Sequence, residues 1–180
     1  DEAALASLLT GARLVSSEAR AKQMAFRFAR PRERTPTLWL GIHLGMTGDL
    51  RVEPAKFDPG HHDHLVLYQK HRALVLSDPR MFGAVLFSST NDEPDWWSKL
   101  PPPVTSDAFT LDLVQAFFKR RARLAVKAAL LVQERFPGVG NWMADEILWR
   151  ARFSPKRLCG KLTRAQTEAV WRETRAVCQI

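Results

Sequence analysis

The sequence predicts an α+β protein in which a β layer is followed by a helical module. In the first half, short apolar runs are separated by Gly, Pro and Asp turns, as in an antiparallel sheet or sandwich. A Trp- and Pro-rich linker at residues 91–103 then changes the composition, and beyond it apolar residues recur at helical spacing. We therefore place one domain at residues 1–103 and a second at residues 104–180.

The first domain is expected to open with a short helix at residues 2–9 and to continue mainly as strands. Residues 24–28 alternate between apolar and other side chains, which is typical of a half-buried strand. Between Pro31 and Pro36 the chain is basic and polar, which predicts a turn. Further apolar runs predict strands at residues 38–44, 65–68, 73–77 and 83–87.

The second domain is expected to be helical throughout. A long amphipathic region, with room for one interruption, is marked by Val114, Phe117, Phe118, Leu124, Leu130 and Leu131. A last helix is expected to start at residues 162–166, where Thr163 and Gln166 have the spacing of a capping box.

Between these helices, residues 136–149 form the most informative stretch of the chain, a tight glycine hairpin that runs straight into a helix. Gly138 and Gly140 permit positive φ and close backbone approach, and Asn141 is predicted to be the N-cap. Such a helix end presents free backbone N–H groups to an anion. By itself the pattern also fits an ordinary capped helix hairpin.

The chain carries a net charge of +8 with a pI of about 10.1, which makes nucleic-acid phosphate the expected anion. A hydrophobic content of 46% over 180 residues argues against disorder, and no apolar run approaches the length of a membrane span. One local cluster of cations, which fits either a solvated helix face or a nucleic-acid site, consists of Lys119, Arg120, Arg121, Arg123 and Lys127.

Two groups of residues invite a metal interpretation. Cys159 and Cys178 have no CxxC partner, so they fit reduced thiols of a cytoplasmic or nuclear protein better than a zinc site. The loop that contains His61, His62, Asp63 and His64 offers consecutive residues, which rarely converge on one ion. We therefore expect no metal site in this chain.

Four segments, in this order, make the sequence similar to the Fpg/Nei family of base-excision DNA glycosylases, and to its formamidopyrimidine-DNA glycosylase branch more than to endonuclease VIII. They are residues 20–23 (RAKQ), 43–48 (HLGMTG), 78–83 (DPRMFG) and 138–148 (GVGNWMADEIL). The loop from Lys56 to Leu65 is also similar, and the resemblance covers most of residues 18–178. It implies a partial β-sandwich followed by a module with a helix–two-turn–helix motif.

The resemblance also implies roles for individual residues. DNA phosphates would be held by Lys22, His43, Lys127 and Asn141. The space left by an extruded nucleotide would be filled, and the opposite base read, by Met46, Arg80 and Phe82. By composition alone the two lysines are ordinary surface residues, His43 is a strand histidine, and Met46 and Phe82 belong in the core.

The activity implied is that of a bifunctional DNA glycosylase with AP lyase activity, which flips oxidised purines (8-oxoguanine and formamidopyrimidines) out of duplex DNA and excises them. Such enzymes begin with proline, whose amine attacks C1′ of the sugar, followed by an acid/base glutamate. The sequence printed here starts at Asp1, so we assign no catalytic residue in this chain and expect it to be a fragment of a longer protein. Zinc is expected only in a C-terminal finger beyond Ile180. Met81 departs from the family by standing where a second arginine is common.

The expected partner is damaged double-stranded DNA, bound by a monomer without membrane association, in the cytoplasmic nucleoid of a bacterium or in a eukaryotic nucleus. Two alternatives remain open. The protein is a DNA-binding relative that kept the DNA clamp and lost the chemistry, or a ribosomal-type protein that uses the hairpin on RNA. The first alternative depends on whether the protein has an N-terminal Pro-Glu, and the second leaves Met46, Arg80 and Phe82 without a role.

Overall fold

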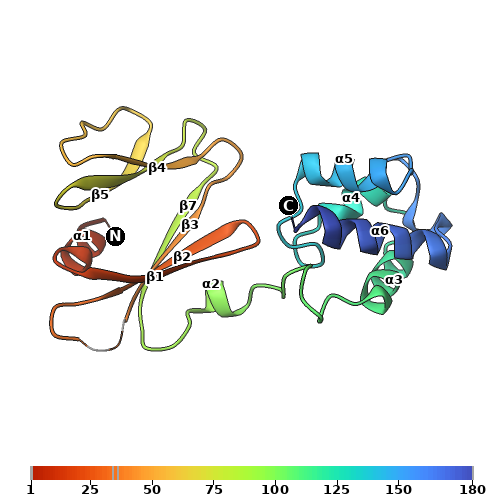
Figure 1. Cartoon of the computed structure of the whole chain (residues 1–180), viewed down its shortest axis with the longest axis horizontal. Helices are drawn as coiled ribbons and strands as arrows, with labels where there is room; N and C mark the ends of the chain where they lie inside the picture. The colour runs from red at the N-terminus through yellow and green to blue at the C-terminus, as the bar shows by residue number, and fades with distance from the viewer. Residues whose placement is uncertain (1, 34, 36, 180) are drawn as a thin grey trace. The chain divides into compact units, whose positions relative to one another are not determined.

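The computed structural model describes residues 2–33, 35 and 37–179, and the chain divides into two compact units, residues 1–98 and 99–180 (Figure 1). The sequence analysis counted the linker up to residue 103 with the first domain. Trp97 belongs to the first unit, where it is buried with the Arg20 guanidinium 4.6 Å from its ring centroid. The turn expected between Pro31 and Pro36 includes Arg34 and Pro36, which lie outside the described residues, as do the two chain ends.

The first unit contains helix α1 (Glu2–Leu9) and two antiparallel sheets, which confirms the expected sandwich architecture. One sheet has the order β1 (Arg13–Arg20), β2 (Gln23–Ala29), β3 (Leu38–His43) and β7 (Ala84–Ser89). The other has the order β4 (Asp49–Pro54), β6 (Arg72–Ser77) and β5 (Asp63–Tyr68). The sequence analysis missed β1 and β4: β1 is almost wholly exposed, and β4 is a short, largely polar run with only two apolar side chains before its last residue, Pro54.

The core of this unit lies between the two sheets and α1. Its buried members are Phe28, Leu38, Leu40 and Ile42 from the first sheet and Leu76 from the second. Three leucines of α1 pack against them: Leu5, Leu8 and Leu9. Burial of these side chains is the main force that holds the layers together.

The first unit ends with α2 (Asp95–Ser98), and the second unit contains α3 (Leu111–Arg120), α4 (Val126–Leu130), α5 (Asn141–Arg150), a 3-10 turn η1 (Cys159–Lys161) and α6 (Arg164–Val177). The break between α3 and α4 is the interruption expected from the sequence. The capping box of Thr163 and Gln166 is confirmed at the start of α6. Phe136, fully buried, makes ring contacts with Phe109, Phe117 and Phe118 at the centre of this core.

Within the described part of the chain, no helix combines the length and the apolar character needed to cross a membrane.

Candidate nucleic-acid interface

Asp78 is the polar centre of two neighbouring loops in the first unit, residues 44–48 and 78–83. Its side chain is 3% exposed, and Oδ2 accepts a hydrogen bond of 2.6 Å from the Gly83 amide. Oδ1 accepts from the Thr47 hydroxyl at 3.3 Å and from the Arg80 amide at 3.4 Å. These donors, the Gly83 amide first, hold the pKa of Asp78 below its usual range, so the carboxylate is charged at neutral pH.

Two glycines let the loops touch. Gly45 has φ +65°, and a Cβ placed on it would lie 2.6 Å from the Phe82 carbonyl carbon. A Cβ on Gly83 would lie 2.8 Å from the His43 carbonyl oxygen. Backbone therefore packs directly on backbone here, and any other residue would separate the loops.

These braced loops display side chains that the core does not use. Met46 is 72% exposed and Phe82 is 53% exposed, so the composition-based assignment of both residues to the core is wrong. The Arg80 guanidinium lies 4.6 Å from the centroid of the Phe82 ring, a cation–π distance. Met46, Arg80 and Phe82 therefore come from two loops in direct contact, on one part of the surface. Met81 is also exposed, with a left-handed φ of +55°.

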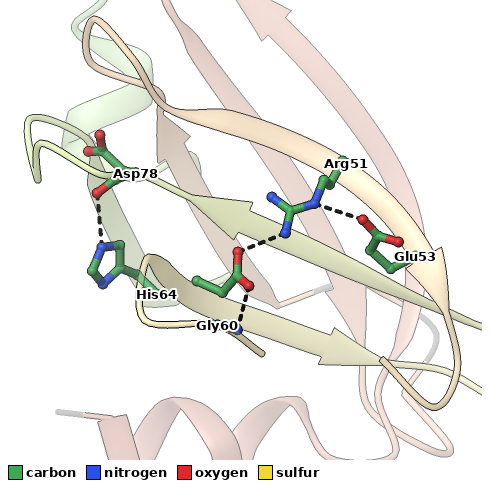
Figure 2. A network of polar contacts seen from close by, with 6 residues as sticks. Arg51, Glu53, Gly60, His64 and Asp78 are labelled. Atoms are coloured by element: carbon green, nitrogen blue, oxygen red, sulfur yellow. Dashed lines mark hydrogen bonds and ion pairs between the residues drawn. The ribbon is translucent and has the colours of Figure 1, made fainter. Parts of the chain in front are cut away.

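A polar network supports the same loops from the second sheet, and Figure 2 shows how its members lie. The His64 Nε2 atom is 3.0 Å from the Asp78 carbonyl oxygen, which can only accept, so Nε2 carries the proton. Asp63 accepts from Arg51 at 2.8 Å and from the Gly60 amide at 2.8 Å. That amide, before the other donors, lowers the pKa of Asp63.

Two polar side chains of the histidine-rich loop, those of Asp63 and His64, therefore have structural partners. The residues that the structure describes contain no cluster of three His, Cys, Asp or Glu side chains able to hold a metal ion. Burial raises the pKa of both the Cys159 and Cys178 thiols to about 11. Zinc in a C-terminal finger beyond Ile180 stays a prediction.

His43 and Lys22 lie at the same end of the first sheet as the exposed loops. The His43 Nδ1 atom accepts a 3.0 Å hydrogen bond from the Gly45 amide, which leaves the proton of the neutral ring on Nε2 as a donor. Strand register pairs His43 with Gln23 on one side and with Ala84 on the other. Lys22 precedes Gln23 in the exposed β1–β2 turn. Five of the seven predicted site residues therefore cluster here.

The other two residues belong to the second unit. Asn141 is exposed at the first position of α5, and the N-cap is Gly140, so the prediction that Asn141 caps this helix is wrong. Gly140 already has the extended backbone of a cap, and its carbonyl accepts the Ala144 amide at 2.9 Å. The Asn141 side chain therefore remains available to a ligand beside the free amides of the helix end.

Lys127 lies on α4, and its Nζ atom is 2.7 Å from a carboxylate oxygen of Asp145. Asp145 follows Asn141 by four residues on α5, so Lys127 and Asn141 lie along one helix face. Among the predicted phosphate-binding lysines, Lys127 is thus held by an acid of its own chain, while Lys22 has no ion pair within the described residues.

Gln133 holds the hairpin between α4 and α5, a role that the sequence analysis missed. Its amide nitrogen donates to the Leu131 and Val139 carbonyls at 3.0 and 2.9 Å, and its Oε1 atom accepts from the Gly138 amide at 3.2 Å. Gly138 has φ +87°, as expected, whereas Gly140 has a negative φ. A glutamine just before a glycine-rich turn was the available signal.

The net charge is divided unequally between the units. Residues 1–98 contain 12 Lys and Arg against 12 Asp and Glu, whereas residues 99–180 contain 15 against 7. All of the net +8 charge therefore belongs to the helical unit, which favours that unit as the part that attracts a polyanion.

Comparisons with known proteins agree with this arrangement. The family model of the formamidopyrimidine-DNA glycosylase N-terminal domain matches residues 1–85, and that of the formamidopyrimidine-DNA glycosylase H2TH domain matches residues 100–180. The formamidopyrimidine-DNA glycosylase of Xanthomonas axonopodis is 44% identical over 123 residues, which are 68% of this chain and 45% of that protein.

Two solved structures share the fold. The MutM (Fpg) protein from Thermus thermophilus has a TM-score of 0.77 and 32% identity, over 94% of this chain and 60% of its own. The Lactococcus lactis Fpg (MutM) complex with DNA containing FAPY-dG has a TM-score of 0.85 at 24% identity, over 98% of this chain and 65% of its own. The chain belongs to the formamidopyrimidine-DNA glycosylase family, and it spans about half to two thirds of the length of these relatives.

Proposed function

We propose that the protein containing this chain is a DNA glycosylase of base excision repair, which extrudes oxidised purines such as 8-oxoguanine and formamidopyrimidines from duplex DNA and excises them. The observation that carries the proposal is the exposure of Met46, Arg80 and Phe82 on two loops locked together through Asp78. A related protein has been solved with DNA containing FAPY-dG, which supports the same class of substrate.

Extrusion of a nucleotide costs a few kcal/mol in lost stacking and pairing, so an enzyme that extrudes its target needs side chains to fill the gap. A flexible Met46 and a flat Phe82 can enter the base stack as wedges. Arg80 can donate two hydrogen bonds to the edge of the orphaned base. Braced loops suit this task, because side chains on a fixed backbone lose less entropy when they insert.

The phosphates flanking the lesion are, in this proposal, held by Lys22 and the His43 Nε2–H group in the first unit and by Lys127 and Asn141 in the second. Cations and amide donors position the duplex without reading its sequence. The expected partner is thus double-stranded DNA, bound by a monomer in the nucleoid of a bacterial cell.

The chemistry requires an amine that attacks C1′ and an acid/base carboxylate, which the proposal assigns to an N-terminal Pro-Glu of the whole protein. The amine displaces the base and forms a Schiff base with the opened sugar, and elimination from this intermediate gives the AP lyase activity. The residues described here do not fit zinc, so no step depends on it.

Borohydride trapping tests the proposal, because reduction of the Schiff base leaves a stable protein–DNA adduct. The whole protein is expected to be trapped on duplexes containing 8-oxoguanine or an abasic site, and not on undamaged duplex. The printed 180 residues are expected to give no adduct. Absence of trapping by the whole protein, with duplex binding intact, would support the alternative of a DNA clamp without chemistry.

Two substitutions in the whole protein test whether the exposed side chains of Phe82 and Arg80 have the proposed roles. Phe82→Ala removes a wedge but no charge, so excision should fall on the order of tenfold while the salt dependence of binding stays the same. Arg80→Ala should also weaken discrimination between C and A opposite the lesion. Single-turnover excision with both duplexes measures these effects, and normal excision by both variants would contradict the assigned roles.

A further inference from the structure

The helical unit carries a basic surface that the lesion-flanking contacts do not use. We define the basic turn as residues 119–123, which end α3 and lead to α4; all five residues are exposed. Four of them are cations: Lys119, Arg120, Arg121 and Arg123. Within the described residues, none of these four forms an ion pair or a side-chain hydrogen bond, so their charge is not compensated locally.

The acids of this unit that form ion pairs do so with cations outside the basic turn. Asp145 binds Lys127 and Glu146 binds Arg150, both at less than 3 Å, and Glu173 lies 3.0 Å from Arg172. The structure thus neutralises cations elsewhere in the unit and leaves the basic turn charged. Four like charges in five residues repel one another, which disfavours the free state and favours binding of a polyanion.

The backbone behind the turn is fixed by a facing segment. The Gly160 amide donates to the Ala122 carbonyl at 3.0 Å, and the Cys159 amide donates to the Leu124 carbonyl at 2.9 Å. A Cβ on Gly160 would lie 2.8 Å from the Ala122 Cβ, so the two backbones are in close contact. The cations therefore project from a built scaffold.

The pairing continues towards Lys127. Ala125 and Leu158 form an antiparallel bridge, and the Lys127 amide reaches the Pro155 carbonyl at 3.4 Å. From Arg121 to Lys127 the chain extends at most about 20 Å at roughly 3.3–3.6 Å per residue. Since each strand of a duplex carries one phosphate per ~3.4 Å of helix axis, this stretch can meet several of them.

The turn also has the shape and chemistry of a phosphate-binding surface. Arg120, Arg121 and Arg123 line an open hollow of about 470 Å³ together with Ala122 and Leu124. Arginine forks match phosphate oxygens in two-pronged hydrogen bonds, and no large apolar side chain of the turn is exposed to favour a protein partner.

We propose that the basic turn binds the sugar–phosphate backbone of duplex DNA in addition to the lesion-flanking site at Lys127 and Asn141, and that it sets the affinity for undamaged DNA. The inference rests on the proposed function for its partner. In this proposal the basic turn acts before excision, because it holds the protein on DNA whether or not a lesion is present.

Titration of the chain with an undamaged, labelled duplex at several salt concentrations tests this inference. In the triple variant Arg120→Gln, Arg121→Gln, Arg123→Gln, the log–log salt slope should fall in magnitude by about 2–3, at roughly 0.9 per lost phosphate contact. The triple Arg→Lys variant keeps the charges and should keep the slope. Melting curves of each variant verify folding, so a loss of binding is not confused with unfolding.

A matched variant removes the same charge from the first unit: Arg13→Gln, Lys70→Gln, Arg72→Gln, all exposed positions. It should bind with nearly the parent slope. An unchanged slope in the turn variant, or an equal loss in the matched variant, would overturn the inference. Neither result depends on trapping of the whole protein on damaged duplex. The salt titration therefore tests the inference, and the trapping experiment tests the proposed function separately.

Discussion

The two units of the chain display different kinds of side chains on their surfaces. The β unit has equal numbers of acidic and basic residues, and it displays Met46 and Phe82 on loops braced by a buried carboxylate. The helical unit carries the whole net charge of +8 and displays cations and a free helix end. Under the proposed function, charge in one unit would provide attraction to DNA, while shape in the other would provide the response to damage. The two properties should then be separable by mutation.

The largest difference in stability should appear between substitutions of a buried and of an exposed phenylalanine. Phe136→Ala removes a fully buried ring with three aromatic neighbours and should lower the free energy of unfolding by about 3–5 kcal/mol. Phe82→Ala removes an exposed ring and should change it by less than about 0.5 kcal/mol. Urea unfolding measures both. A large loss of unfolding free energy in Phe82→Ala would show that Phe82 is a core residue, and it would contradict the contrast between the two units.

The fold was predictable wherever a single residue type or period decides the structure. Alternation gave β2, helical spacing gave α3, and the capping-box spacing gave the start of α6. β1 was missed because it is almost wholly exposed, and β4 because its short run offers only two apolar side chains besides its last residue, Pro54. The N-cap of α5 was predicted one residue too late, at Asn141, because asparagine is a favourable N-cap residue. In the structure the N-cap is Gly140, which has an extended backbone.

The family motifs select a set of candidate site residues, but they do not show how the fold holds those residues in place. Met46, Arg80 and Phe82 follow from the family motifs, but composition alone assigned Met46 and Phe82 to the core. What the sequence could not give are the long-range partners: the contact of Asp78 with Thr47, that of His64 with the Asp78 carbonyl, and the pairing of Lys127 with Asp145. Such contacts depend on tertiary packing, which no local pattern encodes.

The next largest effect is expected at Asp78, whose carboxylate holds the two exposed loops of the β unit together. Because donors in the folded state lower the pKa of Asp78, this group binds its proton more readily in the unfolded chain. Its stabilising contribution is therefore present above the ordinary carboxyl pKa of about 4, and it is lost as the pH falls below that value. Asp78→Asn should lower the melting temperature at pH 7 and show a smaller further loss towards pH 3 than the parent.

Melting curves from pH 7 to pH 3 measure this difference. Asp92→Asn, which changes an exposed acid of the same unit, serves as a control for the change in charge. Equal acid sensitivity of the parent and Asp78→Asn would show that the loops are not braced through this carboxylate.

A smaller effect is expected at the helix end. Asn141→Ala should change the free energy of unfolding by less than about 0.5 kcal/mol, because Asn141 makes no capping bond. Its affinity for duplex DNA should fall about tenfold, the lower end of the cost of losing one hydrogen bond to a charged partner. Asn91→Ala, at the other asparagine of the chain and also exposed, is the matched control. A lower melting temperature with unchanged DNA binding would make Asn141 a structural residue only.

The smallest effect should come from freeing Lys127. In the structure its Nζ atom is engaged by Asp145, an exposed ion pair of the kind that contributes ~0–1 kcal/mol to folding. Asp145→Asn should therefore leave stability nearly unchanged, strengthen duplex binding about twofold to fivefold at low salt, and steepen the salt slope by at most about 0.9, the value for one additional phosphate contact. Glu146→Gln removes the same charge from the next residue, where it releases Arg150 instead, and it controls for the change in net charge. If both variants strengthen binding equally, attraction depends on the total charge of the helical unit. If only Asp145→Asn does so, Lys127 acts at a defined phosphate, and the division between the two units extends to single residues.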